Sequence, residues 1–220
     1  MKSDFCKQLL TNISKTFSLC CLASGVFLTS FNSHALGPVD GEIGLQYWSD
    51  SVNGSFSDTE LDAGTGGIYG ELWLSDKWGI RANYYRNPFE DTRFESSGQL
   101  NLDIKRRFLS PTDNSYFAIG LGYENLDLKN SGSSSGPRLV ADGRLGLVGI
   151  LYFYGQFAWI PVLQSFDNVD DIEARETEFG LVLDPLPFLS LRLGYRNYDI
   201  DHNLGSTGAD GLIFAGGIHW

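Results

Sequence analysis

Apolar and polar residues alternate with a period of two in ten separate stretches of this chain, and this pattern constrains the fold more than any other feature. Successive side chains of a β-strand point to opposite faces, so each stretch predicts a strand with one apolar face. In the clearest stretch, residues 99–108, one face holds Leu100, Leu102, Ile104 and Phe108, and the other holds Gln99, Asn101, Asp103, Lys105 and Arg107. After residue 35, no stretch has helical periodicity long enough to predict a helix. The chain is therefore expected to be all-β.

Long and short connections between these stretches alternate strictly along the chain. Besides residues 99–108, the alternating stretches are residues 42–48, 69–74, 79–85, 116–124, 141–147, 151–159, 178–183, 189–198 and 211–220. Long, polar and acidic connections are expected at about 50–66, 87–97, 126–138, 162–174 and 200–210, and short ones at 75–79, 110–114, near Gly149 and at 184–187. This alternation predicts an antiparallel up-and-down transmembrane β-barrel of about ten strands with both termini on the periplasmic side. Only Gly149 signals the reversal within residues 147–150, so an eight-stranded barrel is the next choice.

The first 35 residues predict a secretory signal peptide. Three lysines form a basic segment, residues 16–30 form a short apolar core, and Ser33 and Ala35 occupy the small-residue positions of a cleavage site. The apolar core is too short to cross a membrane as a helix. We expect export, cleavage near Ala35 and a barrel domain at 36–220, with a retained N-terminal anchor as the alternative.

The composition of the remaining chain narrows the choice further. All three cysteines fall within the first 35 residues, so an exported domain without disulfides needs another source of stability, which a closed hydrogen-bonded barrel supplies. The formal charge is −11, and it becomes −13 when the three lysines and the one aspartate of the first 35 residues are removed. That balance argues against nucleic acid as a partner.

A soluble, lipocalin-like barrel that binds a ligand shows the same alternation, but three features favour lipid on the apolar face. The polar face is rich in small and aromatic residues instead of lysine and glutamate. The apolar face is nearly free of charge over four or five positions per strand, which suffices for a tilted strand to cross a bilayer. The third feature is a set of aromatic residues near the strand ends, as in interfacial girdles: Tyr47, Tyr84, Phe108, Tyr123, Trp159 and Tyr195.

The C-terminal stretch, residues 211–220, ends on a bare tryptophan. Phe214, Ile218 and Trp220 share the apolar face of this stretch. The pattern resembles the assembly signal of Gram-negative outer-membrane β-barrels, although Trp220 stands where most members have phenylalanine. Residues 188–220 also loosely resemble the end of YfaZ-type small outer-membrane proteins. The resemblance implies residence in the outer membrane among lipid and lipopolysaccharide, with the barrel-assembly machinery and periplasmic chaperones as partners, and it implies no settled activity.

The polar face predicts a charged lumen. Acidic and basic side chains are equally numerous there, which favours internal ion pairs over a selectivity ring of one sign. The predicted lumen network comprises Glu42, Glu71, Arg81, Asp103, Lys105, Arg107, Glu124, Asp142, Arg144, Glu178, Arg192 and Arg196. Barrels of eight strands are filled by side chains, so ten strands favour a narrow or closed lumen. Glu71 and Arg81 are expected to meet across the hairpin that joins their strands.

Other motifs carry little chemistry. Residues 132–136 match the G-x-S-x-G nucleophile elbow by letter, but they lie in a predicted loop without the helix that the motif requires. His202 is expected on an outer loop and His219 near the periplasmic rim, both in structural roles. The acidic segments 57–62 and 167–173 offer weak contacts for divalent cations, without the spacing of a dedicated site.

The sequence therefore predicts an outer-membrane barrel without a catalytic site, a cofactor or a dedicated metal. Its function is expected to be structural or interactive, through acidic extracellular loops. Three alternatives stay open: a narrow channel for ions or small solutes, a hydrolase at the outer rim, and the soluble lipocalin-like binder.

Overall fold

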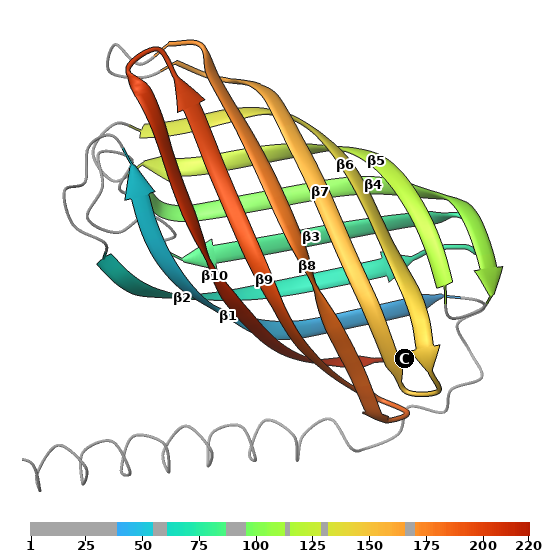
Figure 1. The fold of residues 1–220 in the computed structure, drawn as a ribbon. Coiled ribbons are helices and arrows are strands. Elements are labelled where there is room, and N and C mark those ends of the chain that lie inside the picture. Colours follow the sequence, from blue (N-terminus) through green and yellow to red (C-terminus); the bar gives the residue numbers. More distant parts are fainter. Residues whose placement is uncertain (1–38, 55–60, 87–95, 113–114, 129–131, 166–169) are drawn as a thin grey trace, which may run out of the picture. The chain divides into compact units, whose positions relative to one another are not determined.

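The computed structural model describes residues 39–54, 61–86, 96–112, 115–128, 132–165 and 170–220. In these ranges every regular element is a strand, and the ten strands form one closed barrel (Figure 1). The strands are β1 (Asp40–Gly54), β2 (Leu61–Trp73), β3 (Trp78–Arg86), β4 (Ser96–Thr112), β5 (Ser115–Leu128), β6 (Gly132–Val148), β7 (Leu151–Leu163), β8 (Ile172–Leu186), β9 (Leu189–His202) and β10 (Gly205–His219). Each strand pairs with its neighbours along the chain, and β1 pairs with β10 in antiparallel register. The predicted ten-stranded barrel is confirmed.

The two ends of the barrel differ in their connections. The start of β1 and the C-terminal Trp220 share one end with the turns after β2, β4, β6 and β8 (Figure 1). We call this the terminal end, and the opposite one the distal end. The turn that the sequence signalled most weakly is present as Gly149 and Ile150, between β6 and β7. Gly149 has a φ of 47°, a left-handed conformation that glycine adopts at low cost.

Several connections at the distal end are shorter than expected. Residues 126–138 were expected to form a loop, but β5 runs to Leu128 and β6 begins at Gly132, so residues 132–136 belong to a strand. In the expected loop 200–210, only Asn203 and Leu204 separate β9 from β10. The expected loops at 50–66 and 162–174 are likewise shortened by strand ends, whereas the connection at 87–97 was placed well. These expectations were wrong because a strand that extends past the bilayer has no lipid on its outer face, and so loses the alternating apolar pattern.

The two faces of the barrel wall reverse the usual pattern of a soluble protein. Leu121, on the outer face of β5, is 67% exposed, whereas Glu124, on the inner face of the same strand, is completely buried. Large apolar side chains cover the outside of all ten strands. Strands β4 and β6 have 17 residues each, more than the roughly 9–11 that a tilted strand needs to cross a bilayer. The apolar outer face therefore fits contact with lipid, and some strands continue beyond it.

The predicted aromatic girdle lies on the outer face. Tyr47, Tyr84, Tyr123 and Trp159 are exposed toward the distal side of the apolar surface. At the terminal end, Trp78, Phe188 and Trp220 are exposed in the same way. Arg106, which interrupts the apolar face of β4, lies 5.6 Å from the ring centre of Trp78, as measured from its guanidinium carbon. Aromatic rings of this kind mark the two interfaces of a bilayer.

Candidate functional site: a filled lumen

The structure places all twelve predicted lumen charges on the inner face of the barrel. Seven of them are buried: Arg81, Asp103, Lys105, Glu124, Asp142, Glu178 and Arg196. The other five are half-buried: Glu42, Glu71, Arg107, Arg144 and Arg192. Ionised side chains away from water need partners of opposite charge. The ion pairs inside the barrel form two separate groups, one at mid-height and one near the terminal end.

The mid-height group surrounds Arg138 of β6. Its guanidinium lies 2.7 Å from Glu124 of β5, 2.9 Å from Glu176 of β8 and 3.2 Å from Asp103 of β4. Arg196 of β9 also contacts Glu176, at 3.4 Å. All five side chains are fully buried. We call these five residues the central layer.

Neutral polar side chains complete the central layer. The amide of Gln99 donates to Glu124 at 3.1 Å and accepts a bond from Arg196 at 3.1 Å. The amide of Gln156 donates to Glu176 at 3.2 Å, and the hydroxyl of Tyr198 donates to Glu124. These bonds fix the carboxylates in place. Residues from six consecutive strands, β4 to β9, thus meet across the lumen.

Two members of the central layer were missed in the sequence. Arg138 fell within the expected loop 126–138, and the stretch assigned to β8 began at Glu178, two residues after Glu176. The alternation of inward-facing residues with a period of two could have revealed both Arg138 and Glu176. Arg138 precedes the inward-facing Val140 by two positions, and Glu176 precedes Glu178 by two.

The second group surrounds a small cavity at the terminal end, which we call the terminal pocket. Its volume is about 70 Å³. Four arginines and four carboxylates are among its lining residues: Arg81, Arg107, Arg144, Arg192, Asp40, Glu42, Glu71 and Asp142. Both signs are equally represented, so the charge of these eight groups selects neither anions nor cations.

Ion pairs and aromatic rings hold the charges around the terminal pocket. Lys105 bridges Glu71 at 3.0 Å and Asp142 at 2.6 Å. Arg192 lies 2.7 Å from Glu42, and Arg144 lies 2.7 Å from Asp184. The arginines also cover aromatic faces: the guanidinium carbon of Arg107 is 3.7 Å from the ring centre of Trp73, that of Arg144 is 3.8 Å from Tyr152, and that of Arg192 is 4.4 Å from Tyr69. Such contacts reduce the freedom of long side chains that line a pore.

The expected hairpin pair is only partly as predicted. Glu71 and Arg81 are directly opposite in the register of β2 and β3. The ion pair of Glu71, however, is with Lys105 of β4. Because the lumen curves, an inward side chain can reach past its neighbouring strand to the next one. The strand register alone does not reveal which basic side chain pairs with Glu71.

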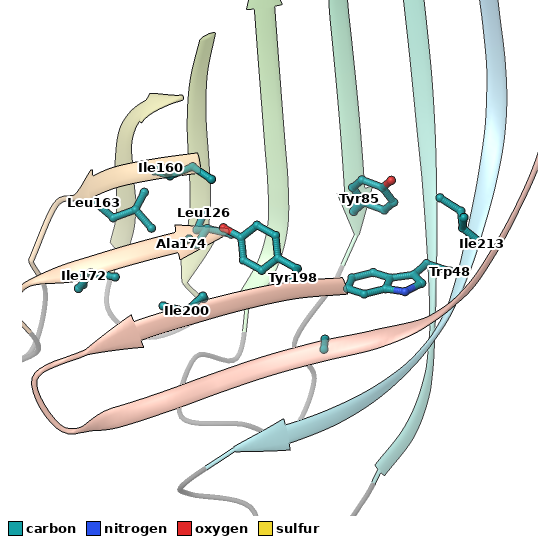
Figure 2. Close-up of a cluster of buried hydrophobic side chains, with 11 residues drawn as sticks. Trp48, Tyr85, Leu126, Ile160, Leu163, Ile172, Ala174, Tyr198, Ile200 and Ile213 are labelled. Carbon is teal, nitrogen blue, oxygen red and sulfur yellow. The ribbon is translucent and has the colours of Figure 1, made fainter. Parts of the chain in front are cut away.

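Beyond the central layer, apolar side chains fill the distal part of the lumen (Figure 2). Trp48, Tyr85 and Tyr198 lie at the end of this group that faces the central layer. The guanidinium carbon of Arg196 is 3.8 Å from the ring centre of Tyr85. The cluster, which we call the apolar cluster, comprises Trp48, Tyr85, Leu126, Ile160, Leu163, Ile172, Ala174, Tyr198, Ile200, Ala209 and Ile213. Each is at most 3% exposed. The lumen is thus occupied by side chains from mid-height to near its distal end.

The residues of the predicted assembly signal lie on the outer face at the seam between β1 and β10. Phe214 and Ile218 are exposed there. Trp220 exchanges two backbone hydrogen bonds with Gly41, at 3.0 and 3.2 Å. A Cβ atom at Gly41 would lie 2.4 Å from the indole of Trp220, so the ring lies directly against this glycine. The last residue of the chain therefore takes part in barrel closure.

His202 and His219 lie at opposite ends of the barrel, as the last residues of β9 and β10. His219 lines the terminal pocket, and the backbone N–H of Leu204 donates to Nδ1 of His202 at 3.2 Å at the end of β9. Within the part of the chain that the structure describes, no group of three or more His, Cys, Asp or Glu residues could hold a metal. Residues 57–60 and 167–169 of the acidic segments, and the predicted signal peptide, lie outside the described residues.

No family model and no curated protein sequence matches the chain. Among solved structures, the outer membrane protease OmpT from Escherichia coli is similar, with a TM-score of 0.53 and 9% identity, over 88% of this chain and 99% of OmpT. The outer membrane protein OprG from Pseudomonas aeruginosa matches with a TM-score of 0.32 and 10% identity, over 83% of this chain and 95% of OprG. At these identities the likeness concerns the fold alone. The chain therefore has the fold of an outer-membrane β-barrel.

Proposed function

We propose that this protein is a closed outer-membrane barrel that acts through its distal surface and does not transport solutes. The observation that carries the proposal is the fully buried central layer beneath the apolar cluster. Together they place charged, aromatic and aliphatic side chains across the lumen. A water-filled channel would require a continuous polar path, which the apolar cluster interrupts.

The distal strand extensions offer the surface for interaction. Acidic residues were expected on long loops, but several lie on the strands themselves. Asp199 and Asp201 are exposed on β9, and Glu173 of β8 accepts bonds from Trp159 at 3.0 Å and from Arg175 at 2.6 Å. A rigid sheet holds these carboxylates at fixed spacing, whereas a loop would not. We place the distal end outside the cell, as the even strand number and the short terminal turns favour.

With the distal end outside the cell, the distal surface would lie beside the lipopolysaccharide of the outer leaflet. Carboxylates and lipid phosphates repel each other unless divalent cations bridge them. The expected partners are therefore lipopolysaccharide and weakly bound Ca²⁺ or Mg²⁺, with the assembly machinery and chaperones acting earlier. A YfaZ-like identity belongs to the same proposal and rests on the loose resemblance of residues 188–220.

Conductance measurements test the closed lumen. Purified, refolded protein should give no steady channel steps in planar bilayers, while an open porin in the same bilayers serves as the positive control. Insertion is verified separately by protection of the barrel from protease. Stable and reproducible steps from the wild-type protein would contradict the proposal and favour a narrow channel.

Charge neutralisation tests the interaction surface. In vesicles that contain lipopolysaccharide, Ca²⁺ should raise the melting temperature of the wild-type barrel. The Asp199→Asn/Asp201→Asn variant should lose most of this increment, and vesicles of phospholipid alone should show little of it. An equal increment in the variant would show that the distal carboxylates do not take part.

A further inference from the structure

The central layer contains more acidic than basic groups. Three of its five members are acidic and two are basic, and all five side chains are fully buried: Asp103, Glu124, Glu176, Arg138 and Arg196. An ionised carboxylate without a partner is so unfavourable away from water that it binds a proton instead. We therefore expect one carboxyl group of the central layer to be neutral.

The charged groups next to the central layer do not supply the missing positive charge. Arg81 faces Asp103 in the register of β3 and β4. Glu178 faces Arg196 in the register of β8 and β9, so these two neighbours add one charge of each sign. Lys105 already contacts two carboxylates near the terminal pocket. On the distal side lies the apolar cluster, which has no charged member. Among the described residues at mid-height, the excess of one carboxyl group remains.

Asn101 of β4 lies between two of these carboxyl groups. One end of its side-chain amide is 3.4 Å from Oε2 of Glu176, and the other end is 3.3 Å from Oε2 of Glu124. Only the nitrogen end can donate a hydrogen bond, so in either orientation the amide oxygen faces a carboxyl oxygen. Two acceptors at this distance repel each other unless one carries a proton. One of the two glutamates is therefore a carboxylic acid that donates to Asn101.

The contacts of the two glutamates identify Glu124 as the acid. Glu176 contacts two guanidinium groups, those of Arg138 at 2.9 Å and Arg196 at 3.4 Å. Among the described ion pairs, Glu124 contacts that of Arg138 alone, at 2.7 Å. The charged form of a carboxyl group is less stable where it has fewer positive partners. Because Oε1 of Glu124 already accepts two hydrogen bonds, Oε2 is the atom left to carry the proton.

We propose that Glu124 of the folded barrel is a proton-binding site that stays occupied at neutral pH. Its Oε2–H group donates to the amide oxygen of Asn101, and the amide nitrogen of Asn101 donates to Glu176. Loss of this proton at high pH would place a negative charge on each side of Asn101, so the site links the stability of the barrel to pH. The titratable and charged groups around the site are Asp103 on β4, Arg138 on β6, Glu176 on β8, and Arg196 and Tyr198 on β9.

Infrared spectroscopy of the refolded wild-type barrel in ester-free detergent micelles tests the site directly. A protonated carboxylic acid gives a C=O stretching band that is separate from the bands of carboxylates. At neutral pH we expect this band in the wild-type protein and its loss in Glu124→Gln. Glu173→Gln is the matched control on the exposed surface of β8, and it should keep the band.

Absence of the band from the wild-type protein would overturn the proposal. A band that persists in Glu124→Gln and disappears in Glu176→Gln or Asp103→Asn would place the proton on another residue and would overturn the assignment to Glu124. If Glu124→Gln does not refold, the spectrum of the wild-type protein still decides whether the central layer holds a proton.

The pH dependence of unfolding gives a second measurement. A glutamate in the unfolded chain is ionised at neutral pH, so the folded barrel binds one proton more than the unfolded chain. The folding equilibrium constant of the wild type should therefore fall about tenfold per pH unit relative to that of Glu124→Gln, between about pH 5 and pH 7. Glu173→Gln should follow the wild type. Parallel pH profiles for the wild type and Glu124→Gln would show that Glu124 holds no proton.

Discussion

At the scale of single residues, Arg138 matters most for the electrostatics of the lumen. Its guanidinium is the common partner of Asp103, Glu124 and Glu176, and all four side chains are fully buried. Removal of one partner from a buried ion pair leaves an uncompensated charge, which costs far more than the intact pair contributes. Arg138 is therefore central to stability even though it is a charged residue in a membrane protein.

Arg138→Ala should lower the free energy of unfolding by about 3–5 kcal/mol. The measurement is urea-induced unfolding of the refolded barrel in lipid vesicles, followed by tryptophan fluorescence. Arg175→Ala is the matched control, because Arg175 makes its 2.6 Å ion pair with Glu173 on the exposed surface. Exposed pairs contribute little, so this control should leave the transition almost unchanged. Equal transitions for both variants would show that the central layer does not stabilise the barrel.

Tyr69 explains why two glycines face each other at the closing seam. Gly44 of β1 and Gly217 of β10 are register partners, and the ring of Tyr69 lies over both on the lumen side. The hydroxyl of Tyr69 donates to Glu42 at 2.6 Å, and Arg192 of β9 lies 2.7 Å from the same carboxylate. This chain of contacts connects β2, β1 and β9 across the seam.

Two adjacent glycines give a matched test of that arrangement. A Cβ atom at Gly217 would lie 2.4 Å from the Tyr69 hydroxyl and 2.9 Å from the carbonyl oxygen of Ile43, so Gly217→Ala should reduce the folded fraction. At Gly216, on the outer face, the nearest atom would be 3.7 Å away, so Gly216→Ala should be tolerated. Heat-modifiable mobility of the refolded proteins measures both. A folded fraction for Gly217→Ala as high as for Gly216→Ala would refute the role given to Tyr69.

At the scale of strands, the pair of β1 and β10 decides whether the barrel is closed. These strands come from opposite ends of the domain, so their pairing orders a long stretch of chain. Their register includes several glycines, which contribute few side-chain contacts. Contacts at the ends of these two strands, such as those of Trp220 with Gly41, therefore contribute more to pairing than end contacts do elsewhere in the barrel.

Deletion of Trp220 should lower the amount of folded protein in the outer membrane several-fold. The deletion removes both backbone hydrogen bonds to Gly41 and the ring that covers this glycine. Trp220→Phe is the control, because it keeps the backbone bonds and an aromatic ring. Membrane fractionation with immunoblotting of unheated samples gives the folded level. A deletion variant with wild-type folded levels would rule out this role.

Strands were predicted well where lipid covers them and poorly where it does not. Residues 99–108 show the full alternation, because their outer face meets lipid and their inner face meets charges. Residues 132–136, in contrast, hold only glycine and serine and were assigned to a loop. They form part of β6 because β5 offers them a partner, with Leu126 opposite Ser134 and Asn125 opposite Ser135. Backbone pairing needs a neighbour and not a particular side chain.

At the scale of the whole molecule, the orientation in the membrane has a direct test. An epitope tag inserted near Asp170, between β7 and β8, should be labelled on intact cells. A tag inserted between Ser110 and Asn114, near the turn after β4, should be labelled only after the outer membrane is breached. The reverse pattern would place the distal end in the periplasm and would contradict the interaction proposed for the distal carboxylates.

The sequence by itself determined the class of fold and the direction of each side chain in the membrane-spanning part, and it favoured ten strands over eight. Lipid and lumen impose opposite polarity on alternate residues, so the local pattern contains this information. Only the tertiary structure decided which charges pair. Arg138 and Glu176 meet from strands that are not neighbours, and Glu71 binds Lys105 although Arg81 faces it in the register. The curvature of a closed barrel brings side chains together across the lumen. No local sequence pattern specifies which of them lie close to each other.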